Sequence, residues 1–199
     1  MRCRAFTLIE ILCVLAIVGT LCGLLFPGFS GARRAAAMAR TRTQFAQWTA
    51  AIEAFRGEYG CYPQFAPNHL VNGGVTTVEH PFHDVLAGRH RDGSVLTAGV
   101  DAALQNRRAI AFCAFDGAWF NEAGLLVDAS GHSAMAVLVD RDLDGVIQAG
   151  TDFVSLPAVD GQAPGEADFP AAGVRAGVVF YALAAGSSPA NPTFVFSWK

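Results

Sequence analysis

The chain has 199 residues, which leaves room for one membrane segment and one modest globular domain. Hydrophobic residues make up 52% of it, charged residues 16%, and the formal net charge is -3. This mildly acidic balance gives no reason to expect a nucleic acid as a partner.

A short basic leader, residues 1–5, runs directly into an apolar block at residues 6–26. At about 1.5 Å per helical residue the block spans about 31 Å, enough to cross the core of a bilayer. Its one charged residue is Glu10. A carboxylate in contact with lipid costs a few kcal/mol, so Glu10 is a functional candidate that requires a partner.

Three common kinds of N-terminal segment do not fully account for this block. A cleaved secretory signal has an apolar core of about 7 to 15 residues, which this block exceeds. A lipoprotein signal has small residues before a cysteine, whereas leucines precede Cys13 and Cys22. A plain membrane anchor fits the length but leaves Glu10 unexplained.

Residues 5–17, with the sequence AFTLIEILCVLAI, closely resemble the cleavage and methylation segment of type IV pilins and of the pseudopilins of type II secretion. In that family a membrane peptidase cuts before the phenylalanine, here Phe6, and the new N-terminus is methylated. The residue before the cut is usually glycine, and here it is Ala5, for which we expect slower or normal processing. The resemblance also covers Pro27, where the family has a helix-bending proline.

The resemblance implies a single span of a bacterial inner membrane, with the leader in the cytoplasm and the C-terminal domain in the periplasm. Cleavage before Phe6 creates an amine four residues from Glu10. In staggered subunits the amine of one copy meets the carboxylate of another, which offsets the desolvation of both groups. Phe6, Glu10 and Pro27 are therefore the expected assembly residues. The expected partners are further copies of the chain, minor pseudopilins, the prepilin peptidase and the inner-membrane assembly platform.

From about Ser30 the sequence becomes amphipathic. Residues at alternating steps of three and four lie on one face of a helix: Met38, Thr41, Phe45, Trp48, Ile52 and Phe55. We expect one long helix over residues 6–58, with a break or bend at Pro27. The predicted divisions are a leader at 1–5, a transmembrane or filament-core helix at 6–27, an amphipathic helix at 28–58 and a globular periplasmic domain at 59–199.

Residues 65–106 show no clear period and predict a partly irregular loop region, with a short helix at 100–107. Strand-like runs follow at residues 109–115, 134–139, 153–159, 174–183 and 193–198. A helix followed by strands indicates an α+β fold. The long N-terminal helix then packs its stripe on a C-terminal antiparallel sheet, as in the type IV pilin fold.

Two groups outside the apolar block have open alternatives. Cys61 and Cys113 are able to pair in an oxidising compartment, or else remain buried free thiols. Residues 79–90 contain imidazole and carboxylate side chains that are competent metal ligands: Glu79, His80, His83, Asp84 and His90. Pro81 opposes a helical arrangement of these ligands, which favours a solvated loop.

Residues 140–148 match the first two-thirds of a calcium-binding loop, with carboxylates at positions 1, 3 and 5 and glycine at position 6. The expected ligands are Asp140, Asp142, Asp144, the Val146 carbonyl, Gln148 through a water molecule, and Asp152 in place of the usual position-12 carboxylate. Three carboxylates so close repel one another without a cation. The alternative is an exposed turn rich in aspartate.

The major pseudopilins hold calcium in a loop before the closing strand. Here that loop, residues 185–192, has no carboxylate, so the loop at Asp140 to Asp144 is expected to serve as a stabiliser in its place.

The resemblance implies a structural subunit of a periplasmic pseudopilus in type II protein secretion. The alternative within the family is a type IV pilin for adhesion, motility or DNA uptake. Such pilins often have a C-terminal disulfide loop, whereas no cysteine follows Cys113, which favours the secretion branch. A membrane-anchored enzyme is the rival class, but the sequence has no nucleophile elbow, paired catalytic carboxylates or phosphate-binding glycine loop.

Overall fold

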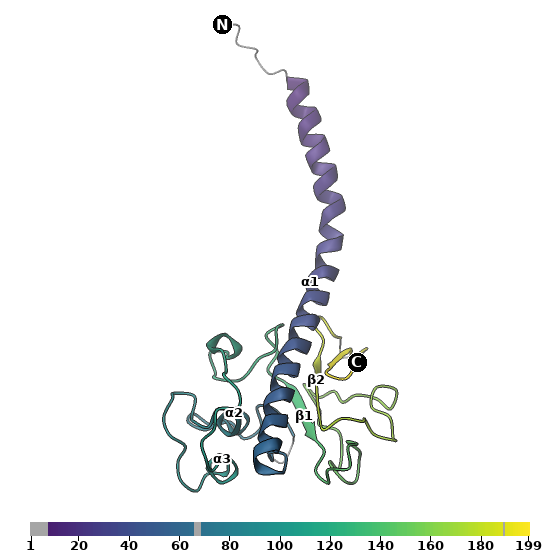
Figure 1. Ribbon diagram of the computed structural model, residues 1–199. Coiled ribbons are helices and arrows are strands. Elements are labelled where there is room, and N and C mark those ends of the chain that lie inside the picture. The colour runs from purple at the N-terminus through teal and green to yellow at the C-terminus, as the bar shows by residue number, and fades with distance from the viewer. Residues whose placement is uncertain (1–7, 66–68, 189) are drawn as a thin grey trace. The chain divides into compact units, whose positions relative to one another are not determined.

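The computed structural model describes residues 8–65, 69–188 and 190–199 (Figure 1). The chain divides into two compact units, Met1–Ala36 and Ala37–Lys199. The elements in chain order are α1 (Leu8–Tyr59), α2 (Pro81–Ala87), α3 (Asp101–Gln105), the 3-10 turn η1 (Gly117–Trp119), β1 (Met135–Val139), β2 (Val178–Leu183) and β3 (Phe194–Phe196). The predicted α+β class is therefore confirmed. The processing residues Ala5 and Phe6 lie outside the described residues.

The described part of the first unit is the N-terminal stretch of α1. The helix continues without interruption through Pro27 and Gly28, so the break that the sequence allowed is absent. A proline removes one helical hydrogen bond, and a helix accommodates this loss without ending. The large apolar side chains between Leu8 and Leu21 are all exposed, at 49% to 81%, and they point in every direction around the helix. Within the described part of the chain, no helix is long and apolar enough to span a membrane.

The second unit begins where α1 turns amphipathic. Its predicted stripe is buried: Thr41, Phe45, Trp48 and Ile52 are 0% exposed, Phe55 is 1% exposed, and Met38 is partly buried against the same core. Figure 1 shows this stretch of α1 running along β1 and β2, with α2 and α3 to one side. The stripe prediction is confirmed.

The sheet is antiparallel, with the strands in the order β1-β2-β3. Met135 lies opposite Ala182, and Tyr181 lies opposite Phe196. Successive side chains of a strand point to opposite faces. One face, with Val137 and Phe180, packs on α1 and α2. The other face packs on residues of the long β1–β2 connection, which are Ile147, Phe153, Val159, Phe169 and Val174. Both faces are therefore covered, and β1 is buried along its whole length.

Two predicted strands are wrong. At residues 109–115, the backbone N–H groups of Phe112 and Cys113 both donate to the carbonyl of Leu86 at the end of α2, so this segment caps a helix instead of pairing with a strand. At residues 153–159, Phe153 and Val159 are buried and each makes only an isolated bridge. Their apolar character reflects burial of single side chains under the sheet.

The helix α2 was not predicted. His80 is its N-cap, with the ring accepting a hydrogen bond from the backbone N–H of His83, and Pro81 starts the first turn. Proline is well suited to that position because its missing N–H has no helical partner there. The short helix predicted at 100–107 is confirmed by α3.

The stripe leads to a stability prediction. We expect Ile52→Ala to lower the free energy of unfolding by about 2–5 kcal/mol, because it leaves a cavity in a closely packed core. Urea denaturation of the full chain in detergent, followed by tryptophan fluorescence, measures this change. Gln47→Ala on the exposed face of the same helix is the control and is expected to change the value by less than about 0.5 kcal/mol. Equal effects of the two substitutions would contradict the assigned packing.

Candidate functional site

The acidic loop, residues 140–152, begins directly after β1. Asp140 is 1% exposed, and its carboxylate accepts hydrogen bonds from the backbone N–H groups of Asp144 (3.2 Å) and Gly145 (2.8 Å). The Asp144 carboxylate accepts one from Val146 N–H at 2.7 Å. Gly145 has φ +87°, a backbone conformation that glycine adopts without strain. The loop therefore winds around the carboxylates of its first half.

The loop brings three potential ligand atoms together. One carboxylate oxygen from each of Asp140, Asp142 and Asp144 lies within 4.8 Å of the others, and among the described residues no other group of three His, Cys, Asp or Glu does so. Ligands on opposite sides of one Ca²⁺ are about 5 Å apart, and calcium prefers carboxylate and carbonyl oxygens. The donor set therefore fits a calcium ion.

Asp152 closes the loop. It is 1% exposed, and its two carboxylate oxygens accept hydrogen bonds from the backbone N–H groups of Arg141 (2.6 Å) and Gln148 (2.8 Å). The buried Ile147 forms a backbone bridge with Val174, which anchors the second half of the loop in the core. The geometry gives Asp152 a structural role, and direct ligation by it stays a prediction.

The ionised carboxylates of the acidic loop repel one another. Partial desolvation raises the pKa of Asp142 above its usual value, and the negative charges of Asp144 and Asp152 add to this. A cation between the carboxylates would attract each of them. This attraction would offset their mutual repulsion and so favour their ionised forms.

A second feature joins the acidic loop to the C-terminal end of α1. Asp140 N–H donates to the carbonyl of Gly177 at 2.9 Å. A side chain at Gly177 would overlap the Tyr62 hydroxyl and the Glu53 carboxylate. Tyr62 donates to Glu53 at 2.8 Å and accepts from Arg56 at 2.9 Å, and burial and the bond to Glu53 raise the pKa of Tyr62 to about 12. The tyrosine after α1 thus fixes the helix against the start of β2.

The histidine-rich segment does not form the solvated loop that the sequence favoured. His80, His83, Asp84 and His90 are all buried. The Asp84 carboxylate accepts hydrogen bonds from Nδ1 of His83 and Nδ1 of His90, both at 2.8 Å. These residues offer no group of three ligand atoms close enough for one ion among the described residues. The imidazoles of His83 and His90 therefore orient around the Asp84 carboxylate.

The sequence left open whether Cys61 and Cys113 pair or stay buried free thiols. Cys61 and Cys113 are both free, with Cys61 exposed and Cys113 partly buried against the main core. Burial raises the pKa of the Cys113 thiol to about 11, which makes it a weak nucleophile.

Sequence reasoning missed two polar networks, the partly exposed one of Glu53, Arg56 and Tyr62 and the buried one around Asp84. The spacing of Glu53 and Arg56 places them on one side of the α1 end, and the order His80-Pro81 is an N-cap followed by a first-turn proline. These local signals were available. The partners of these residues, Gly177 among them, come from distant parts of the chain, which no local pattern indicates.

Comparison with known families gives one match. Residues 1–26 match the family described as the prokaryotic N-terminal methylation motif. This segment is characteristic of type IV pilins and pseudopilins, so the resemblance seen in the sequence is confirmed for the N-terminal segment. The comparisons with curated proteins and with solved structures gave no match.

The match covers residues 1–26 of the 199-residue chain and therefore characterises its N-terminal segment. A prepilin-type segment implies processing by a prepilin peptidase, assembly into pilin-type filaments and a membrane-anchored N-terminus. Proteins of this class are generally structural and not enzymatic. The motif does not distinguish pilins from pseudopilins.

The contact at Gly177 leads to a second prediction. We expect Gly177→Ala to destabilise the chain by about 1–3 kcal/mol, because the added methyl group displaces Tyr62 from Glu53 in a closely packed region. Thermal unfolding of the full chain measures this change. Gly165→Ala is the matched control, since a Cβ there meets nothing within 4 Å, and it is expected to be neutral or slightly stabilising. A neutral Gly177→Ala would argue against the contact.

Proposed function

We propose that the chain is a structural subunit of a periplasmic pseudopilus in type II protein secretion, assembled through its N-terminal helix. The observation that carries the proposal is the exposure of apolar side chains all around α1 between Leu8 and Leu21, directly within the methylation motif. A helix that is apolar on every side is stable only where lipid or other protein surrounds it. In this proposal, lipid surrounds the helix before assembly, and neighbouring copies of the helix surround it afterwards.

The energetics favour close packing of many copies. Complete burial of one Leu, Ile or Val side chain contributes about 1.5–3 kcal/mol relative to exposure to water. Thr20, an uncharged polar side chain in this stretch, donates to the carbonyl of Ile17 at 2.8 Å within its own helix, so its burial leaves no unsatisfied hydroxyl. The surface of α1 therefore suits an apolar environment.

Glu10 sets the axial register of the subunits in this proposal. It lies in the first turn of α1, where the helix N-terminus favours a carboxylate. Cleavage between Ala5 and Phe6 supplies an amine, and the Phe6 amine of one copy pairs with Glu10 of the next. The helix around Pro27 completes the assembly segment. A buried pair of this kind specifies register, because the amine of one copy and the carboxylate of the next meet at only one stagger.

The secretion branch is favoured over the type IV pilin branch by the sequence after Cys113, which contains no further cysteine. The proposed location is the bacterial inner membrane, with one span and the second unit in the periplasm. The proposed partners are minor pseudopilins, the prepilin peptidase and the inner-membrane assembly platform. The alternative is a type IV pilin with a role in adhesion, motility or DNA uptake.

The assembly proposal predicts that Glu10→Ala abolishes filaments while the protein stays in the membrane. Removal of one partner of a buried ion pair costs about 3–5 kcal/mol, which is ~100-fold or more in subunit association. Filaments are counted by electron microscopy, and secreted protein is measured in the culture medium. Glu122→Ala in the second unit is the control and is expected to leave both values unchanged. Normal filaments with Glu10→Ala would contradict the assembly role of this residue.

A deletion strain separates the two branches. Loss of exported protein without loss of surface pili supports the pseudopilus. Loss of pili with normal export would replace the proposal by the type IV pilin alternative.

We further propose that the acidic loop binds one calcium ion. The ligands are Asp140, Asp142, Asp144 and the Val146 carbonyl, with Gln148 acting through a water molecule and Asp152 as the residue that completes or closes the loop. The proposal is supported by the cluster of three carboxylate oxygens and by the raised pKa of Asp142. Bound calcium would stabilise the loop and, through Gly177, the end of α1.

The calcium proposal predicts a concentration-dependent rise in melting temperature of the full chain in detergent. At a calcium concentration 100 times Kd the gain is about 2.7 kcal/mol, or roughly 5–10 °C for a unit of this size. Asp142→Asn is expected to remove most of the response, whereas Asp160→Asn outside the loop is expected to keep it. An identical melting temperature with calcium and with chelator would refute the site.

A further inference from the structure

The charges of the chain are distributed unevenly along the sequence. Residues 11–52 contain no aspartate or glutamate, and they contain four arginines, which are Arg33, Arg34, Arg40 and Arg42. Residues 53–199 contain 16 acidic and 8 basic residues, a formal net charge of -8. A basic stretch of α1 is therefore joined to an acidic remainder. Surfaces of opposite charge on one chain are complementary between copies of that chain.

Arg40 and Arg42 are the arginines of this stretch that belong to the second unit. Both are exposed, and neither forms an ion pair within the residues that the structure describes. Two residues apart on a helix, they project about 200° from each other, on either side of the surface opposite the buried stripe. A partner that contacts this exposed side of α1 therefore meets an arginine at each margin.

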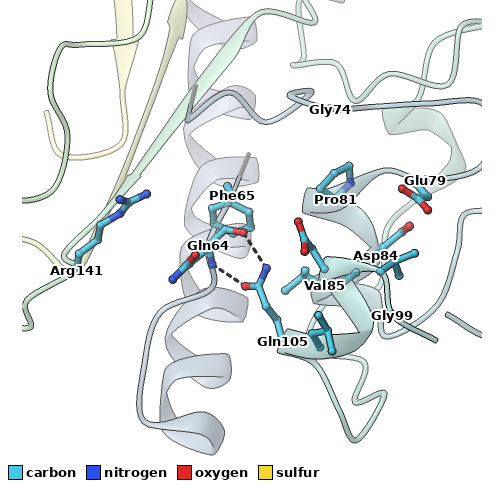
Figure 2. Close-up of a pocket in the computed structure, with 14 residues that line it drawn as sticks. Gln64, Phe65, Gly74, Glu79, Pro81, Asp84, Val85, Gly99, Gln105 and Arg141 are labelled. Carbon is cyan, nitrogen blue, oxygen red and sulfur yellow. Dashed lines mark hydrogen bonds between the residues drawn. The ribbon is translucent and has the colours of Figure 1, made fainter. Parts of the chain in front are cut away.

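A cavity of about 670 Å³ is lined by residues of α2, of α3 and of the segment after α1 (Figure 2). We refer to it as the α2–α3 hollow. Its apolar walls include Pro81, Val100 and Leu104. Cavities of about 300–1,000 Å³ have the usual size of ligand sites, so the hollow has room for a long side chain from outside.

The charged groups of the hollow leave an excess of negative charge. Three carboxylates and one guanidinium line it, those of Glu79, Asp84, Asp101 and Arg141. The Asp84 carboxylate is buried and accepts hydrogen bonds from two histidine rings. The carboxylates of Glu79 and Asp101 have no ion-pair partner in the described ranges of the chain. Figure 2 shows Arg141 well separated from Glu79 and Asp84.

Other polar groups at the hollow already have partners. The Gln105 side chain donates from Nε2 to the carbonyl of Gln64 at 3.0 Å and accepts from the Gln64 N–H at 2.6 Å (Figure 2). The Glu79 N–H donates to Oγ1 of Thr76, and its carbonyl accepts from the Thr76 N–H, both at 2.9 Å. The backbone of Glu79 is thus fixed while its carboxylate stays available to a guest.

An arginine side chain matches this chemistry. Its methylene stem packs on apolar walls, and its planar guanidinium makes directed hydrogen bonds to carboxylates. An anionic guest would instead be repelled by Glu79 and Asp101. The hollow therefore has the charge and the walls that the exposed side of α1 requires in a partner.

We propose that the side of α1 that carries Arg40 and Arg42 docks on the α2–α3 hollow of a second copy of the chain. There the two arginines pair with Glu79 and Asp101. This inference rests on the proposed assembly into filaments, and it adds a contact between the second units to the contact at Glu10.

The contact has a defined direction and offset. Arg42 and Tyr59, the last residue of α1, are about 25 Å apart along the helix, and Figure 1 shows α2 and α3 beside this C-terminal end of α1. Copies inserted in one membrane point the same way, so docking requires an axial offset of roughly this length. A head-to-tail contact of this kind does not close on itself and extends into a filament. The offset exceeds the ~6 Å of helix between Phe6 and Glu10, so the contact joins more distant neighbours of the filament.

Charge reversal tests the contact. We expect Arg40→Glu with Arg42→Glu to lower the number of filaments about tenfold or more, because like charges then face each other across the contact. The same loss is expected for Glu79→Lys with Asp101→Lys. The combination of all four substitutions is expected to restore at least about half of the filaments, since it re-forms opposite charges. Electron microscopy of cells that express the full chain counts the filaments.

Glu122→Lys with Glu166→Lys is the matched control, because both residues are exposed and lie outside the hollow. It changes the net charge by the same amount. It is expected to leave the filaments of the otherwise unaltered chain unchanged and to restore none in the arginine-reversed chain. Thermal unfolding in detergent checks the fold of each variant. Where reversal in the hollow lowers the melting temperature, Glu79→Gln with Asp101→Asn replaces it, with a smaller loss of filaments expected.

Unchanged filaments with either double reversal, or no restoration by the combination, would overturn the docking contact. Loss of filaments with the arginine reversal alone would also overturn it and would assign these arginines to another anionic partner, such as lipid headgroups. Failure of the assembly proposal itself is distinguishable, because it appears as normal filaments with Glu10→Ala.

Discussion

The second unit depends on the packing of one aromatic group. The ring centroids of Phe45 and Phe180 lie 5.2 Å apart, those of Trp48 and Phe82 lie 5.2 Å apart, and those of Trp48 and Phe180 lie 5.7 Å apart. These contacts join α1, α2 and β2 at one point. Large aromatic side chains bury much apolar area and prefer such inclined or offset arrangements. The helix stripe, the first face of the sheet and the short helix α2 are all positioned by this group.

The sequence predicted the parts of the fold that follow from periodicity. The stripe from Met38 to Phe55 is visible because a helix repeats every 3.6 residues, and the runs that became β1, β2 and β3 are bounded by turn residues. The same reasoning failed at residues 153–159, where single buried side chains imitate a strand. It failed at α2 because Pro81 was taken as an obstacle to a helix, although proline is favourable at a first turn.

The candidate site was predictable in a similar, partial way. The spacing of Asp140, Asp142, Asp144 and Gly145 marks a loop that winds around its own carboxylates, since each ligand position is local. The burial of His80, His83, Asp84 and His90 was not predicted, because burial depends on tertiary packing. His80 and Asp84 are polar, and their burial is made acceptable by the hydrogen bond from His80 to Asn72 and by those from His83 and His90 to Asp84. The disulfide was undecidable from the sequence, because pairing depends on a distance between distant segments.

The close contact between the Tyr62 hydroxyl and the backbone of Gly177 has a mechanical consequence. Tension that acts on the last turns of α1 reaches Tyr62 through Glu53 and Arg56, which both hold its hydroxyl. From Tyr62 the load passes by direct contact to the backbone that begins β2, and from there to the first residue of the acidic loop. Rigid backbone contact transmits force with less loss than flexible side chains, and a glycine permits the closest approach. The C-terminal end of α1 is thus fastened to the backbone at the start of β2 as well as to the loops around it.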